Sequence, residues 1–455
     1  MLLHDLNGRT VCILGYGKEG KAMVKALEEF APECAITIAD KNPATLVEGE
    51  AHGKQIGEGW LENLGTFDVI IKSPGIPPKD IPAKVGKKIT NSTQIFLEEA
   101  AARGATVIGV TGSKGKSTTS TLIHEILKAG DKKTFLVGNI GEPAIAHLKD
   151  ASLDTARSEP QRTIFVLEMS SYQLMDCHVS PPISVITTFF PEHLDYHSTR
   201  CGSLMASPAS STPLENYLEA KSHITRFQTE ADFVVYDASS SGAEEIAMHS
   251  PGKRIAAQAE DLPAESMELK GEHNRRNAAI AFLTTRLLGI PERVSIPVIQ
   301  NFQGLPHRLQ SLGIRHGAEW VDDAISTTPE STIAALNALG DRVATIILGG
   351  QDRGNDFTAL GKRIAESKIK TVILFPGSGP RIREAIQASK AHIDFFEVET
   401  MQEAVERAKS QIANRKSQIV PIVLLSTASP SYGMFRNFEE KGDVFRRCIE
   451  GKNLV

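Results

Sequence analysis

The 455-residue chain is 41% hydrophobic and 23% charged, and its formal net charge is −5. At roughly 150 residues per domain, this length predicts about three domains, and the acidic balance excludes a nucleic-acid-binding protein that relies on a basic surface. The five cysteines form no CxxC pair, which excludes a disulfide framework and a zinc knuckle and indicates a reducing compartment.

The distribution of apolar residues along the chain predicts the cellular compartment. The segment Met1–Thr10 lacks the apolar core of a signal peptide, because acidic and polar residues interrupt it. No uninterrupted apolar run is long enough to span a bilayer. We therefore expect a cytoplasmic monomer that binds neither membrane nor nucleic acid.

In chain order, short apolar runs alternate with helical patterns, which predicts an α/β fold with parallel sheets. The predicted boundaries are 1–94, 95–302 and 303–455. Polar or small residues predict loops over 153–162 and 198–215. Strands are expected at 10–15, 35–40, 67–75, 105–112, 162–171, 182–189, 343–350, 371–377 and 419–427, and helices at 18–30 and 94–104.

A glycine-rich loop follows the strand predicted at 105–112 and precedes a helical pattern. Backbone N–H groups at such a loop, together with the positive end of the helix, attract phosphate oxygens. Lys116 suits the β and γ phosphates, and the Ser117 hydroxyl suits Mg²⁺. The spacing is the short form G-x-x-G-K-S. The residues expected to bind the nucleotide are Thr111, Gly112, Ser113, Lys114, Gly115, Lys116, Ser117 and Thr118.

A second glycine-rich loop lies near the N-terminus, at Gly15, Gly17 and Gly20, and Asp40 ends the next predicted strand. This pattern is typical of a dinucleotide site. It also suits the diphosphate of another nucleotide, or the close packing of a helix on a strand. From the loop alone these three interpretations stay open.

Charged residues elsewhere indicate a site around the central loop. Glu168 ends a predicted strand and suits Mg²⁺. His193 and Asp195 would share one face if extended, and suit a metal or phosphate contact. Lys221, taken alone, is typical of a solvated helical surface.

Later residues predict further nucleotide and substrate contacts. Asn274 and Asn277 would share a helix face and suit an adenine edge. Arg308 suits a transferring phosphate. Arg353, in a glycine-rich turn, suits a substrate carboxylate.

Together these motifs resemble the Mur ligase family, whose members form amide bonds with ATP in peptidoglycan synthesis. The motifs that carry the resemblance are GVTGSKGKSTT (109–119), GNIG (138–141), LEMSSYQL (167–174), PEHLDYH (191–197), YLEAK (217–221), GEHNRRNAA (271–279), GLPHRLQ (304–310), DDAISTTPES (322–331), LGGQDRGNDF (348–357) and SPSYGMFRNFEEKGDVF (429–445). They span nearly the whole chain.

The resemblance implies three domains: an N-terminal Rossmann-like domain for a uridine nucleotide, a central ATPase domain of P-loop type and a C-terminal Rossmann-like domain. It implies that ATP lies on the central loop, with Asn277, Arg308 and Asp323. Two Mg²⁺ ions would be held by Ser117, Glu168, His193 and a carbamoylated Lys221, and the catalytic set would be Lys116, Asn139, His193 and Lys221.

The resemblance also implies the substrates: UDP-N-acetylmuramoyl-L-alanine, ATP and glutamate, with D-glutamate expected. The first glycine loop would hold the uridine diphosphate. The residues implied for the UDP substrate are Gly15, Gly17, Gly20, Asp40, Ser73, Pro74, Gly75 and Asn139, and those for glutamate are Thr327, Arg353, Ser431 and Phe438.

Three departures from the family pattern leave L-glutamate as an alternative. They are Arg353 and Ile325 in places where lysine is usual, and the string LLSTASPSYG at 424–433. A folylpolyglutamate synthase is disfavoured by the residues before Gln94, and a diaminopimelate-adding ligase by the absence of a DNPR string. An NAD-dependent oxidoreductase and a non-catalytic nucleotide-binding regulator are alternatives from other classes.

Overall fold

The computed structural model forms two compact units, Met1–Phe302 and Gln303–Val455. Each unit is described by itself. The structure describes residues 1–47, 52–82, 85, 88–151, 153–154, 161–194, 196–198, 212–269, 271–389, 393–413 and 420–452. Within these ranges, no helix combines the length and the apolar character that crossing a bilayer requires.

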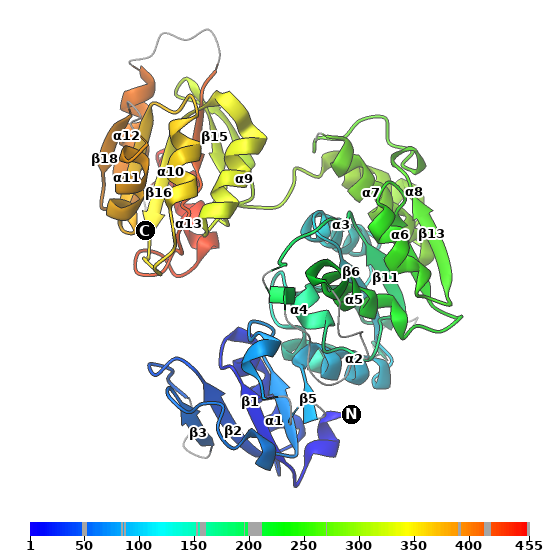
Figure 1. Cartoon of the computed structure of the whole chain (residues 1–455). Helices are drawn as coiled ribbons and strands as arrows, with labels where there is room; N and C mark the ends of the chain where they lie inside the picture. The colour runs from blue at the N-terminus through cyan, green and yellow to red at the C-terminus, as the bar shows by residue number, and fades with distance from the viewer. Residues whose placement is uncertain are drawn as a thin grey trace. The chain divides into compact units, whose positions relative to one another are not determined.

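The first unit begins with a parallel sheet of strand order β3-β2-β1-β4-β5, coloured blue in Figure 1. Its central strands are buried, as their continuous apolar sequences predict. Its elements are β1 (Thr10–Leu14), α1 (Lys18–Phe30), β2 (Ala35–Asp40), β3 (Gly53–Ile56), β4 (Val69–Lys72) and β5 (Ile89–Thr90).

A second parallel sheet follows in the same unit, with strand order β13-β12-β11-β6-β10-β7. Its strands are β6 (Thr106–Thr111), β7 (Thr134–Gly138), β10 (Ile164–Glu168), β11 (Ile183–Ile186), β12 (Phe233–Asp237) and β13 (Lys253–Ala257). Its helices are α2 (Ser92–Ala102), α3 (Lys116–Ala129), α4 (Ser171–Leu174), α5 (Pro213–Arg226), α6 (Ser241–Met248), α7 (Glu272–Leu287) and α8 (Glu292–Asn301).

Two segments predicted as loops carry some regular structure. At 153–162 the two ends pair as a short antiparallel ribbon, β8 (Leu153–Asp154) with β9 (Gln161–Arg162). Of the segment 198–215, residues 199–211 lie outside the described residues, and α5 begins at Pro213. A capping box explains this start, because the Thr212 hydroxyl accepts the Glu215 N–H and the Glu215 carboxylate accepts the Thr212 N–H.

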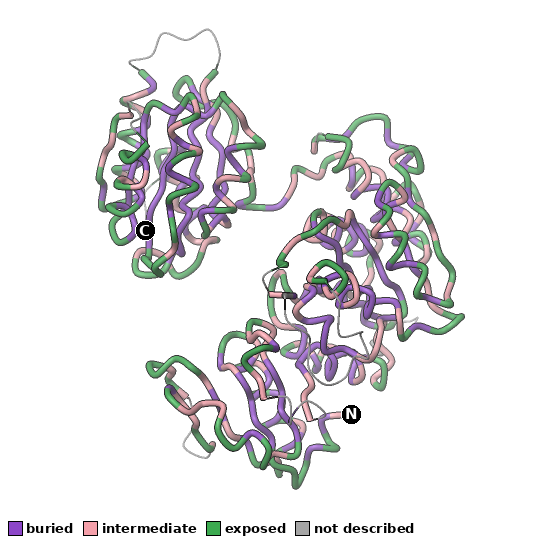
Figure 2. The backbone as a smooth tube through the Cα atoms, viewed as in Figure 1, coloured by how far each residue is buried: buried purple, intermediate pink, exposed green. Residues whose placement is uncertain are grey.

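The second unit has a sheet of order β14-β15-β19-β16-β17-β18, in which only β14 is antiparallel to its neighbour. Figure 2 shows its buried strands beneath more exposed helices. The strands are β14 (Gln310–Arg315), β15 (Ala318–Asp322), β16 (Val343–Gly350), β17 (Thr371–Gly377), β18 (Asp394–Glu397) and β19 (Ile422–Leu425). The helices are α9 (Pro329–Leu339), α10 (Thr358–Ala365), α11 (Gly379–Gln387), α12 (Met401–Ala413) and α13 (Phe438–Glu450).

In both units the predicted site residues follow the carboxyl ends of parallel strands. Glu168 ends β10, the central loop follows β6, and Asp323 follows β15. Parallel strands present these ends at one edge of the sheet, which is where ligands bind in open α/β folds.

Candidate active site

The central loop joins β6 to α3 through two glycines in the left-handed region. Gly112 has φ +144° and Gly115, the N-cap of α3, has φ +91°. A Cβ on Gly115 would lie 2.4 Å from Asn277 Oδ1, so α7 brings Asn277 directly against the loop. The structure thus unites the loop with the asparagine predicted to read adenine.

Two lysines converge on the carbonyl of Gly112. Lys116 Nζ donates to Gly112 O at 2.8 Å and to Ser113 O at 2.9 Å. Lys221 Nζ donates to the same Gly112 O at 2.8 Å and to Thr111 Oγ1 at 3.3 Å. The ammonium group of Lys116 gives the loop a positive charge, which suits a triphosphate.

Lys221 is 1% exposed, so its interpretation from helix position alone, a solvated lysine, is wrong. Burial lowers the pKa of Lys221 well below its ordinary value, and the nearby charge of Lys116 lowers it further. The α5 face that carries Lys221 packs onto the second sheet, where Tyr217 and Ile224 are also buried. The lysine is therefore part of the site and not of the surface.

Glu168 is 1% exposed, although it ends a strand at the loop edge of the sheet. Its Oε1 accepts from Asn139 Nδ2 at 2.8 Å. Its Oε2 has no hydrogen-bond partner among the residues that the structure describes. A buried carboxylate oxygen without a partner is costly, so this atom suits a cation. The predicted residues Asn139 and Glu168 thus lie together.

His193 stands beside two tyrosines of the site. It has φ +55°, and its ring centroid lies 5.2 Å from that of Tyr172 and 6.5 Å from that of Tyr217. The Tyr217 hydroxyl and Ser113 Oγ are 3.0 Å apart, and burial raises the pKa of Tyr217 to about 12. The extended backbone assumed for His193 and Asp195 is therefore wrong at His193, and Asp195 lies outside the described residues.

No three His, Cys, Asp or Glu side chains gather as a metal-binding group within the described ranges. The lone oxygen of Glu168 is the observation that fits a cation here. Lys116 already contacts the loop, while Lys114, 68% exposed, pairs with Glu192 at 2.7 Å. Ser117 and Thr118 occupy the first turn of α3, at its positive end.

The first glycine loop is built mainly from backbone contacts. Gly15 has φ +94°, and Ser73 Oγ donates to its carbonyl at 2.9 Å. A Cβ on Gly20 would lie 2.1 Å from Gly15 O, whereas one on Gly17 would meet nothing within 4 Å. Gly17 is therefore the place where a ligand can approach, and Gly20 serves helix packing.

Asp40 contacts this loop through one carboxylate oxygen, and its other oxygen caps the turn after β2. Oδ2 accepts the Tyr16 N–H at 2.7 Å and Oδ1 accepts the Asn42 N–H at 2.8 Å. Pro74 and Gly75 follow Ser73 directly after β4, at the same edge of the sheet. The residues predicted for the UDP substrate thus form one neighbourhood, except Asn139, which lies beside Glu168 on the second sheet.

In the second unit, Asp323 is buried at the end of β15. Its Oδ1 accepts the Leu309 N–H at 3.2 Å and its Oδ2 accepts from Ser426 Oγ at 2.7 Å. Burial raises the pKa of Asp323 to about 6, and the charge of Arg308 opposes that shift. Arg308 itself is exposed.

The four residues predicted to bind glutamate lie in three loops and at the first residue of one helix. Arg353 Nε donates to Gln351 at 3.3 Å, and its guanidinium lies 5.6 Å from the Tyr432 ring. Ser431 is 5% exposed and its hydroxyl has no partner in the described part of the chain. Thr327 precedes α9 and Phe438 begins α13.

Sequence reasoning missed Lys441 on α13. It is 1% exposed, its Nζ donates to Thr427 Oγ1 at 2.5 Å, and burial lowers its pKa to about 7. The next residue, Gly442, packs closely against His307: a Cβ at this position would lie 2.0 Å from His307 Nδ1. A glycine inside an otherwise regular helix was the available signal of this close approach.

Comparison with known proteins gives two family matches. The model described as the Mur ligase middle domain matches residues 110–258, and that of the Mur ligase, glutamate ligase domain matches residues 307–423. A relative from Salinispora tropica, named UDP-N-acetylmuramoyl-L-alanine--L-glutamate ligase, is 33% identical and covers 99% of each chain. One from Symbiobacterium thermophilum, named UDP-N-acetylmuramoylalanine--D-glutamate ligase, is 32% identical and covers 96% of this chain and 97% of its own.

Solved structures share the fold at lower identity. A UDP-N-acetylmuramate-alanine ligase from Thermotoga maritima is 16% identical, with a TM-score of 0.52 over 97% of this chain and 99% of that chain. A MurF ligase from Thermotoga maritima, in complex with ADP, is 15% identical, with a TM-score of 0.50 over 99% of this chain and 97% of that chain.

Proposed function

Because the chain belongs to the Mur ligase family, we propose that it joins glutamate to UDP-N-acetylmuramoyl-L-alanine at the expense of ATP. The observation that carries this proposal is the convergence of Lys116 and Lys221 on the Gly112 carbonyl, at a loop of G-x-x-G-K-S sequence. The ADP complex of a MurF ligase with the same fold supports ATP as the phosphate donor.

The proposed reaction has two steps. The alanyl carboxylate attacks the γ phosphate of ATP, which gives an acyl phosphate and ADP. The glutamate amine then attacks the acyl carbon, and the tetrahedral intermediate loses phosphate to leave the amide. Lys116 and the loop amides would stabilise charge on the transferring phosphate. We propose that His193 accepts the proton that the amine loses.

The residues present fit magnesium. Glu168 offers a buried oxygen without a partner, and Ser117 and His193 belong to neighbouring segments of the first unit. Mg²⁺, when bound with ATP, neutralises charge on the phosphates. We infer that two ions bind, with Lys221 contributing a ligand oxygen once it is carbamoylated.

Carbamoylation of Lys221 needs a neutral amine, since the nitrogen lone pair attacks CO₂ and a proton leaves. Burial lowers the pKa of Lys221 and so favours the neutral form. The product is a carboxylate, which replaces a neutral amine by an anion beside Lys116. Carbon-13 NMR of the protein in labelled bicarbonate tests this step: a carbamate signal present in wild type and absent from Lys221→Met supports it.

The enantiomer of glutamate has two candidates. D-Glutamate is the first, supported by the names of the relatives from Symbiobacterium thermophilum and Streptococcus agalactiae. L-Glutamate is the second, favoured by the names of the Salinispora tropica and Micromonospora relatives, both 33% identical. Ile325 and Arg353 also depart from the usual lysines in the predicted glutamate pocket.

The deciding experiment measures phosphate release from ATP with UDP-N-acetylmuramoyl-L-alanine and each enantiomer in turn. Release with one enantiomer assigns that substrate. Release with neither would refute the proposed function. Nicotinamide absorbance, followed in parallel, tests the rival oxidoreductase, which would require hydride transfer.

We further infer the division of labour along the chain. Residues 1–94 would bind the UDP substrate, 95–302 ATP and 303–455 the amino acid together with part of the nucleotide, through Arg308 and Asp323. A reaction that consumes ATP and a nucleotide-linked precursor suits the cytoplasm, and we propose that the enzyme acts as a monomer.

A further inference from the structure

A buried ion pair joins the end of β4, in the first sheet, to the segment that follows α4, beside the second sheet. Lys72, the last residue of β4, is 2% exposed, and Asp176, two residues beyond α4, is 6% exposed. Lys72 Nζ lies 2.9 Å from Asp176 Oδ2. The same ammonium donates to the carbonyl of Ile76 at 3.3 Å. The proposed function gives this pair no role.

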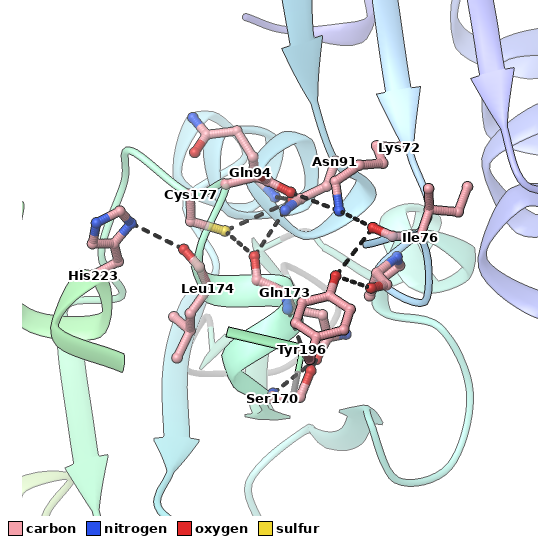
Figure 3. Close-up of polar contacts among 12 residues, drawn as sticks. Lys72, Ile76, Asn91, Gln94, Ser170, Gln173, Leu174, Cys177, Tyr196 and His223 are labelled. Atoms are coloured by element: carbon pink, nitrogen blue, oxygen red, sulfur yellow. Dashed lines mark hydrogen bonds and ion pairs between the residues drawn. The ribbon is translucent and has the colours of Figure 1, made fainter. Parts of the chain in front are cut away.

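A tyrosine reaches the same carbonyl from another segment. The Tyr196 hydroxyl lies 2.7 Å from Pro74 O and 3.1 Å from Ile76 O. Figure 3 shows Tyr196 with its hydroxyl directed at Ile76, and Lys72 approaching from the end of its strand. Ile76 O is therefore contacted by two side chains, one from the end of β4 and one from a segment that follows β11.

The residues on the two sides of these contacts differ in their predicted roles. On the first sheet, loop 73–76 holds the first glycine loop, because Ser73 Oγ donates to Gly15 O. On the other side, in segments that follow strands of the second sheet, Asp176 lies eight residues after Glu168, and Tyr196 lies three residues after His193. Each contact thus connects the loop for the UDP substrate with a segment that carries a predicted metal ligand.

We propose that Lys72, Asp176 and Tyr196, here called the inter-sheet bridge, are positioning residues. The bridge fixes loop 73–76 relative to Glu168 and His193, so that a substrate held by its diphosphate on the first loop presents its carboxylate to the central loop. The identity of that substrate rests on the proposed function. The fixed geometry itself rests only on the contacts described.

The inter-sheet bridge is better suited to fixing the position of loop 73–76 than to stabilising the fold. A buried ion pair loses hydration that its attraction largely offsets, so it adds little net stability. It does enforce one arrangement, because moving either partner leaves a buried charge unpaired. Since a misplacement of about 1 Å can lower a rate about 100-fold, a fixed distance between the substrate loop and the phosphate loop matters for turnover.

Two single variants and one double variant test the bridge. Tyr196→Phe removes the hydroxyl and keeps the ring, whose centroid lies 3.9 Å from that of Tyr172. Lys72→Met keeps the length of the side chain. Lys72→Met combined with Asp176→Asn leaves no unpaired charge, so it reports on geometry even where the single lysine variant fails to fold.

Matched controls remove the same groups elsewhere in the first unit. Tyr236→Phe removes a hydroxyl on β12, and Lys54→Met removes an exposed lysine on β3. We expect Tyr196→Phe and the double variant to raise the KM for the UDP substrate and lower kcat, together by about tenfold or more in kcat/KM. The KM for ATP should not change, and the controls should match wild type.

Hydrogen exchange gives a readout that does not depend on activity. Amide exchange in the segment 72–77 should become faster in the bridge variants than in the controls, at equal thermal stability of the central domain. Unchanged exchange would overturn the bridge whatever the activity. Faster exchange with an unchanged KM and kcat would overturn the positioning role. A wild-type protein without ligase activity would refute the proposed function, while exchange would still decide whether the bridge holds the loop.

Discussion

The two glycine loops share one backbone plan and differ in their charges. Each follows a parallel strand and begins a helix, β1 to α1 and β6 to α3, and each contains a glycine of closely similar φ, +94° at Gly15 and +91° at Gly115. Around the first loop the side-chain contacts come from the Asp40 carboxylate and the Ser73 hydroxyl, which bind backbone groups of the loop. At the central loop two lysines converge on the Gly112 carbonyl, and Glu168 ends a neighbouring strand of the same sheet.

This difference shows what a glycine pattern can and cannot indicate. The glycines permit close packing of a helix and a strand, and both loops need that. Under the proposed function, the chemistry depends on residues far away in sequence, such as Lys221, which contacts the central loop, and Glu168, which ends the strand beside it. A glycine motif therefore predicts that a phosphate can come close to the backbone. The surrounding charges determine what happens to that phosphate.

Removing the loop cation should have the largest effect. Lys116→Met takes away the ammonium that would stabilise the transferring phosphate, so kcat should fall by about 10²–10³-fold. Phosphate release measures this. Lys128→Met, which removes an exposed lysine at the other end of the same helix, is the control. A loss under tenfold for Lys116→Met would remove the main distinction between the two loops.

The carboxylates that end β2 and β10 offer a matched pair. Glu168→Gln takes a charge from the site, and we expect kcat to fall by about 100-fold. Asp40→Asn removes an acceptor for one of two backbone N–H groups, which should cost about 1 kcal/mol of stability and less than tenfold in turnover. Steady-state kinetics and denaturant unfolding measure both. Equal losses of turnover would contradict this difference between the two carboxylates.

Two glycines of the first loop are expected to have different roles: Gly20 allows the helix to pack, and Gly17 allows a ligand to approach. Gly20→Ala would place a Cβ 2.1 Å from Gly15 O, so the free energy of unfolding should fall by about 1–3 kcal/mol. Gly17→Ala meets nothing within 4 Å and should stay within about 0.5 kcal/mol of wild type. Urea unfolding compares the two. We expect Gly17→Ala to weaken UDP binding instead, and similar unfolding curves for both variants would contradict this division.

The smallest effect is a dependence on pH. Below 10.5 and above the lowered pKa of Lys221, the unfolded chain holds a proton that the folded chain lacks. The free energy of unfolding of wild type, relative to Lys221→Met, should therefore rise with pH and level off above 10.5. The slope should not exceed about 1.4 kcal/mol per pH unit. Urea unfolding in CO₂-free buffer measures it, and a flat difference would contradict the burial of a titrating amine.

Much of the fold follows from periodicity. The predicted bounds of α1 and β16 agree with the structure, and the α/β class is confirmed. The interior strand β12 was not predicted, and neither was β13, which lies at a sheet edge and has four of its five residues not buried. Edge strands give a weaker pattern, since only part of their surface meets the core.

The site could be predicted only where its residues follow strands or belong to motifs. Glu168 and the central loop do so, and the structure places them together with Asn139. Lys221 was recoverable only through the family resemblance, because no local pattern distinguishes a buried lysine from a solvated one. The pairing of Lys72 with Asp176 joins segments far apart in sequence, and no local rule could supply it.

The covalent connection between the two units has a consequence for how such chains evolve. The chain passes from one compact unit to the other once, between Phe302 and Gln303. A single recombination event at this junction would therefore exchange residues 303–455 as a block and leave the sheets of the first unit intact. Under the proposed division of labour, a gene could acquire a different preference for the incoming amino acid in one step, without altering how the precursor is held.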